Sequence, residues 1–103
     1  MPYTVSQVWY PPDKADEVAK KYLEVLEQFP IDESVEKEVV PAAVTSIKNG
    51  IHTMTIREVK KENLFEAFDR STKMLVQFRD IEGFRYQLKV WLTVEEALES
   101  IGM

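Results

Sequence analysis

Residues 41–59 read PAAVTSIKNGIHTMTIREV, two β-rich runs separated by Asn49-Gly50. This dipeptide is the strongest short-range signal for a β-hairpin, because both residues of the tight turn then take positive φ angles. Pro41 has no amide hydrogen and is tolerated on an edge strand, so the first arm is expected at a sheet edge. A two-residue loop at Asn49-Gly50 fixes the register, with Lys48 opposite Ile51, Ile47 opposite His52, Thr45 opposite Met54 and Ala43 opposite Ile56.

Helical periodicity flanks this hairpin on both sides. Before it, apolar residues recur every three or four positions between Asp13, an expected N-cap, and Pro30, which ends the helix. The expected buried stripe is Ala15, Val18, Ala19, Tyr22, Leu23, Leu26 and Phe29. After the hairpin, Asn63 and Glu66 have the spacing of a capping box and predict the start of a second helix. Its expected stripe is Leu64, Phe68, Ser71, Leu75 and Phe78.

Two further strands complete the pattern. Residues 4–10 are rich in β-formers and stop at a double proline, and residues 84–92 alternate between apolar and polar side chains. Thr93 and Glu96 then open a short tail helix that runs to Ile101. This order predicts a single α+β domain over residues 1–103 of ferredoxin-like βαββαβ form. It has a four-stranded antiparallel sheet, two helices on one face and a short C-terminal helix, and the strand with Pro41 lies at an edge.

Composition excludes several classes of function. The 103 residues carry a formal net charge of −5 and include no cysteine. Disulfide scaffolds, thiolate catalysis and cysteine-based zinc sites are therefore excluded, and nucleic acid is disfavoured as a partner. No phosphate-binding glycine loop and no metal-ligand spacing occurs, so we expect no cofactor and no metal. Without a signal-peptide pattern or an apolar stretch of spanning length, we expect a cytoplasmic protein with no membrane contact.

The face of the sheet that two helices leave open is expected to mix apolar and polar side chains. The last strand places Gln87, Lys89 and Trp91 there. On the third strand the more polar side is assigned to this face, and it carries Thr53, Thr55 and Arg57 with Ile51 and Val59. On the first strand Gln7 and Trp9 are assigned to it. A large, partly apolar exposed patch of this kind is typical of an interface or a ligand groove.

The segment from Gly83 to Trp91, GFRYQLKVW, followed by Thr93-Val94-Glu95-Glu96-Ala97-Leu98, resembles small uncharacterised prokaryotic members of the dimeric α/β-barrel superfamily. In that superfamily, two ferredoxin-like subunits pack sheet to sheet. The resemblance covers nearly the whole chain and implies a homodimer. Members include cofactor-independent monooxygenases, haem-degrading enzymes, isomerases and decyclases, and stress-responsive proteins, and the fold does not choose among these activities.

Few residues are candidates for chemistry. His52, the only histidine, could act as a base, but a strand-end histidine with no chemical role is the simpler interpretation. Arg57 and Lys89 could hold a carboxylate or an oxyanion, and a cross-strand pair with a glutamate is the simpler interpretation. Trp9 and Trp91 could stack on a flat substrate or fill a dimer interface. The acidic residues Asp32, Glu33, Glu36 and Glu38 are expected to form a solvated loop.

Three functions remain open. The first is a homodimer whose two sheets enclose a small-molecule cavity, with ligand contacts from Gln7, Trp9, Thr55, Gln87 and Trp91. The second is a cofactor-independent monooxygenase or isomerase that acts on a small aromatic or enolisable substrate, with His52 and Arg57 as the catalytic candidates. The third is a protein–protein interaction module whose open sheet face binds a different protein. A convergent acid–base geometry separates the second from the first.

Overall fold

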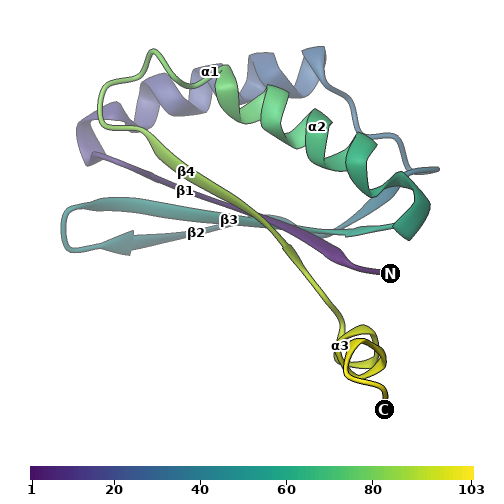
Figure 1. The fold of residues 1–103 in the computed structure, drawn as a ribbon. Coiled ribbons are helices and arrows are strands. Elements are labelled where there is room, and N and C mark those ends of the chain that lie inside the picture. Colours follow the sequence, from purple (N-terminus) through teal and green to yellow (C-terminus); the bar gives the residue numbers. More distant parts are fainter.

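The computed structural model describes residues 1–103 and contains one four-stranded antiparallel sheet of order β2-β3-β1-β4 (Figure 1). The strands are β1 (Tyr3–Tyr10), β2 (Glu36–Ile47), β3 (Gly50–Val59) and β4 (Arg85–Trp91). The helices are α1 (Ala15–Gln28), α2 (Leu64–Val76) and α3 (Val94–Ser100), and 3-10 turns at Pro12–Lys14 and Lys61–Asn63 precede α1 and α2. The predicted α+β class is confirmed, and the order of elements is consistent with the ferredoxin-like form.

The helices divide the two faces of the sheet unequally. Figure 1 shows α1 and α2 together on one face, whereas α3 stands apart from them, on the other side of the sheet and beyond the end of β4. The second face is therefore left open by α1 and α2, as the sequence predicts. No helix of the chain is both long enough and apolar enough to cross a membrane.

The helix starts differ from the predicted ones in their capping. Neither Asp13 nor Asn63 caps a helix through its side chain, because each lies in the 3-10 turn that precedes α1 or α2. The turn before α2 is closed by the backbone bond from Asn63 N to the Lys60 carbonyl at 2.8 Å, and the Asn63 side chain donates from Nδ2 to Glu66 Oε2 at 3.4 Å. The capping box of α3 is confirmed: Glu96 N donates to Thr93 Oγ1 at 3.2 Å, and Thr93 N donates to Glu96 Oε1 at 2.9 Å.

The hairpin forms where predicted, but its turn lies one residue earlier. Ile47 pairs with Gly50, so the loop is Lys48-Asn49, and the register is Thr45 opposite His52 and Ala43 opposite Met54. Only Gly83 and Gly102 have positive φ angles, so the predicted positive-φ turn at Asn49-Gly50 is wrong. From Ile51 to Met54, each β3 residue faces a β2 residue two positions from the predicted partner, and an even shift keeps partners on the same face. Irregularities on both sides of Val40 then change the register further, so Ile56 faces Val40 and Arg57 faces Glu38.

Gly50 has a different structural reason to be glycine. It is buried, and a β-carbon added to it would overlap the backbone carbonyl oxygen of Tyr10 on the neighbouring strand β1. The residue is therefore required by the close approach of two backbones rather than by its own dihedral angles.

The pairing of strands also decides which residues face the helices. Cross-strand partners share a face, and the partners Val8 and Thr53 both line a cavity beneath α1 and α2. The prediction that Thr53, Thr55 and Arg57 lie on the open face is therefore wrong. The open face of β3 carries His52, Met54 and Ile56 instead. The assignments on β1 and β4 are correct, since Gln7 pairs with both Met54 and Gln87.

The apolar core is split into two clusters. The larger joins α1 to α2 and the loop after it, through Val18, Val25, Met74, Phe78 and Ile81, and Phe78 stacks on Phe84 with ring centroids 4.8 Å apart. The smaller cluster lies at the other end of the sheet and contains Val35, Val59 and Ala67.

The buried stripe of α1 is rotated from the predicted one. Leu23, 64% exposed, and Leu26 face solvent, whereas Val25 is fully buried between the helices. The prediction is confirmed for Ser71 and Leu75 of α2 and for Phe78, which follows the helix and is also buried. The difference arises because α1 packs against α2 as well as the sheet, so its apolar residues do not all point one way.

Gly50→Ala is expected to lower the free energy of unfolding by about 1–3 kcal/mol, the typical cost of forcing atoms into filled space. The matched variant Asn49→Ala should change it by less than about 0.5 kcal/mol, because Asn49 is exposed and its φ angle is negative. Urea denaturation of both variants measures the difference. Equal losses at the two positions would contradict the close-approach explanation.

Candidate functional site

The open face of the sheet carries a polar and aromatic group at its centre. The rings of Trp9 and His52 stack with their centroids 4.7 Å apart and their planes 19° apart. His52 Nε2 lies 2.9 Å from Gln7 Oε1, and because an amide oxygen only accepts, Nε2 is the donor in this contact. His52 thus lies on the open face beside two predicted ligand residues, as part of a fixed aromatic pair.

The neighbouring strand β4 extends this group. Gln87 lies opposite Gln7, and Arg85 lies opposite Trp9. A depression of about 750 Å³ includes Trp9, Arg85 and Gln87 together with Ile47 and Asn49 near the hairpin loop. Four predicted residues of the first hypothesis, Gln7, Trp9, Gln87 and Trp91, therefore share one face. Trp91 lies at its other end, opposite Tyr3, and is 53% exposed.

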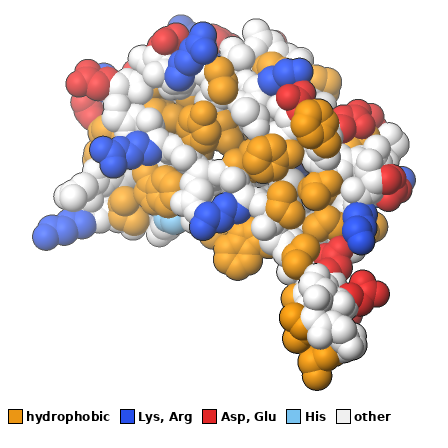
Figure 2. Space-filling view, in the orientation of Figure 1, with side chains coloured by type: hydrophobic (Ala, Val, Ile, Leu, Met, Phe, Trp, Pro, Cys, Tyr) orange, Lys and Arg blue, Asp and Glu red, His pale blue; other side chains and the backbone are white.

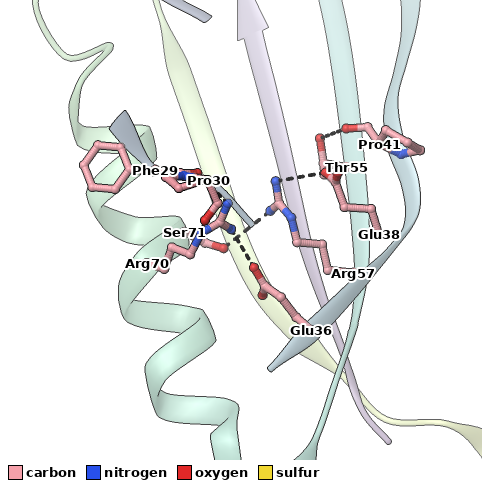
Figure 3. Close-up of polar contacts among 9 residues, drawn as sticks. All are labelled: Phe29, Pro30, Glu36, Glu38, Pro41, Thr55, Arg57, Arg70 and Ser71. Carbon is pink, nitrogen blue, oxygen red and sulfur yellow. Dashed lines mark hydrogen bonds and ion pairs between the residues drawn. The ribbon is translucent and has the colours of Figure 1, made fainter. Parts of the chain in front are cut away.

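The helix side of the sheet holds a second polar group, in which Arg57 and Arg70 are the cations (Figure 3). Arg70 Nη1 lies 2.5 Å from Glu36 Oε1, and its other nitrogens donate to backbone carbonyls, Nη2 to Phe29 at 2.7 Å and Nε to Pro30 at 3.2 Å. Arg70 therefore binds the C-terminal end of α1 and the first residue of β2 at once.

Arg57 is less well bound. Its Nη2 lies 3.5 Å from Glu38 Oε2, and its Nη1 lies 3.5 Å from Ser71 Oγ. Thr55, the third residue wrongly assigned to the open face, donates from Oγ1 to the carbonyl of Pro41 at 3.1 Å. His52 and Arg57 lie on opposite faces of β3, so they cannot act in one site, and the enzyme hypothesis now depends on His52 without Arg57.

Sequence reasoning missed the residues that bind these arginines. Glu36 and Glu38 belong to β2 rather than to a solvated loop, and Glu36 is only 3% exposed. Arg70 follows from no local pattern, because its partners lie on other elements. One signal was available: Glu36 and Glu38 are two residues apart, so on a strand both fall on one face.

Burial sets the direction of the pKa shifts in this group. Loss of hydration raises the pKa of the Glu36 carboxyl, and the nearby Arg70 and Arg57 guanidinium groups oppose this rise. Burial likewise lowers the pKa of Arg70, which the Glu36 carboxylate opposes. Burial thus disfavours the charged form of both Glu36 and Arg70, and the attraction between their charges opposes this cost.

Comparison with known proteins supports the fold alone. No protein-family model matches the chain, and no curated protein sequence matches it. Among solved structures, the chain is similar to a de novo designed protein, Foldit4, with a TM-score of 0.58 and 10% identity over 90% of this chain and 99% of that one. It is also similar to the uncharacterised protein TM1266 from Thermotoga maritima, with a TM-score of 0.50 and 13% identity over 86% and 94% of the two chains.

Arg70→Met is expected to lower the free energy of unfolding by about 3–5 kcal/mol near neutral pH, because it leaves the buried Glu36 carboxylate without its partner. The double variant Arg70→Met with Glu36→Leu should recover part of this loss, since it removes the unpaired charge. Thermal or urea denaturation measures both.

The loss in Arg70→Met should also depend on pH. A carboxyl whose pKa is higher in the folded state than its ordinary value of 4.5 favours folding when protonated. The deficit caused by Glu36 ionisation should therefore be absent below about pH 4.5, grow as the pH rises toward the folded-state pKa, and stay constant above it. A deficit that is the same at every pH would contradict this assignment.

Proposed function

We propose that this protein is a homodimer in which two copies pack open face to open face and enclose a small-molecule cavity. The single observation that carries the proposal is α3, whose capping box defines it as a helix and none of whose residues is buried. The apolar side chains of Val94 and Leu98 in α3 are exposed, and Ile101, directly after the helix, is 70% exposed. Figure 2 shows apolar side chains along this protruding helix.

The occupant we assign to this surface is a second copy of the chain. The helix α3 lies on the side of the sheet away from α1 and α2, which is the side of the open face (Figure 1). In a dimer with two-fold symmetry, the same surface of both copies forms the interface. The open face and α3 of each copy are then buried by the other copy, and no different protein is needed. A stable interface needs about 800 Å² from each partner, an area that a four-stranded face together with a helix can supply.

The residues at the centre of the open face fit a ligand cavity better than a dry interface. Ligand pockets combine apolar walls with a few polar groups that fix orientation. Met54 and Ile56 of β3 would supply apolar wall, the Trp9–His52 ring pair a flat surface, and Gln7 and Gln87 hydrogen-bonding groups. The proposed ligand is therefore a small molecule with a flat, partly apolar body.

Light scattering after gel filtration should give twice the chain mass of 12.0 kDa at micromolar concentration. Leu98→Glu should weaken the dimer at least ~100-fold, because a carboxylate would be buried in an apolar contact. The matched variant Ser100→Glu adds the same charge to α3 at an exposed polar position and should keep the dimer.

Both variants should keep the circular dichroism of the parent and a cooperative melting transition, since α3 adds no buried residue to its own chain. A parent protein that is a 12.0 kDa monomer at micromolar concentration would overturn the proposal and favour a surface for a different protein.

A further inference from the structure

A cavity of about 230 Å³ lies between the sheet and the two covering helices. Protein interiors contain few voids larger than a water molecule, so a space of this size is unusual in a small domain. An engineered cavity of ~150 Å³ already holds benzene. The cavity can therefore hold a molecule with one ring and a short side chain.

The lining residues indicate where the cavity opens. Ala19 and Tyr22 of α1 and Ala42 and Val44 of β2 are exposed, whereas Arg57 and Ser71 are buried. The mouth therefore lies between α1 and the edge strand β2, and the buried residues Arg57 and Ser71 lie at the inner end. The apolar residues along the walls are Val8, Val18, Val25, Met74, Leu75 and Phe78.

Arg57 at the inner end has donors without good acceptors. It is 7% exposed, its Nε has no hydrogen-bond partner, and its two other contacts are long, at 3.5 Å each. A guanidinium has five N–H donors, and leaving a buried donor unpaired costs stability. Arg57, which lines the cavity, therefore keeps unused donor capacity at its inner end.

The charges around Arg57 decide what kind of acceptor fits. Two cations, Arg57 and Arg70, face two carboxylates, Glu36 and Glu38, so the formal charges of the group cancel. An anionic ligand would meet no net positive charge and would lose its hydration on entry. An uncharged oxygen acceptor satisfies the free donor without adding charge.

We infer that this cavity binds a small uncharged carbonyl compound, such as a phenyl-substituted alkyl ketone, with its apolar body between the helices and the sheet and its oxygen accepting from Arg57. The site is separate from the dimer cavity, because the two lie on opposite faces of the sheet. Its occupancy therefore does not depend on dimerisation.

Three probes of similar shape test this assignment: benzylacetone, which carries a ketone, butylbenzene, which has no oxygen, and hydrocinnamate, which carries a carboxylate. Calorimetry should show benzylacetone binding about tenfold more tightly than either of the others, as expected for one hydrogen bond to a buried donor. Amide chemical shifts should change at Arg57, Ser71 and Thr53, which line the cavity, on addition of benzylacetone.

Two variants at exposed positions of α1 locate the binding. Ala19→Phe should fill the mouth and abolish benzylacetone binding, whereas Leu23→Phe on the same helix, outside the cavity lining, should keep it. Arg57→Met should bring benzylacetone and butylbenzene to equal affinity if that variant folds. If Arg57→Met does not fold, the ratio of the benzylacetone and butylbenzene affinities in the parent still tests the role of Arg57. The two α1 variants still test the location of the site.

Equal affinities for benzylacetone and butylbenzene in the parent would overturn the role of Arg57. Tighter binding of hydrocinnamate would overturn the assignment to uncharged ligands. Benzylacetone binding that survives Ala19→Phe, or shifts confined to the open face, would overturn the location.

Discussion

The guanidinium of Arg70 fixes how the helices and the sheet meet. From the middle of α2 it donates to the carbonyls of Phe29 and Pro30 at the end of α1 and pairs with Glu36 at the start of β2. Arg57 also joins three elements, β3, β2 and α2, but through longer contacts of 3.5 Å each (Figure 3). The second arginine, Arg57, is bound less completely, because its Nε has no hydrogen-bond partner and neither has Glu36 Oε2. The uneven polar interior follows from this arrangement.

The same arrangement explains why the core is split. Apolar packing concentrates between α1 and α2 at one end and around Val59 at the other. Between these clusters the sheet presents the small side chains Ser6, Thr53 and Thr55 to the helices. Side chains of this size leave space that a leucine or phenylalanine would fill, so the cavity is the direct result of polar, small residues at the centre of the covered face.

Sequence reasoning was most successful where one element is amphipathic by itself. The alternation of Gln87, Lys89 and Trp91 placed β4 correctly, and the Asn49-Gly50 pair located the hairpin although its turn differs. It failed on β3, where both sides mix polar and apolar residues, so polarity could not decide which side faces the helices. The pairing of Arg57 with Glu38 and Ser71 made the polar side the covered one, and contacts between distant elements of this kind leave no periodic pattern.

The edge strand β2 has a consequence for how copies of this chain can associate. A free strand edge offers unpaired backbone groups to which another chain can add a strand. In β2 the ladder to β3 is irregular on both sides of Val40, and Pro41 has no amide hydrogen to offer a neighbour. These features interrupt the outer edge near its middle, so a further strand could bind only along short segments. Growth of the sheet from this edge is therefore disfavoured, and β2 can be a long edge strand without acting as a template for polymerisation.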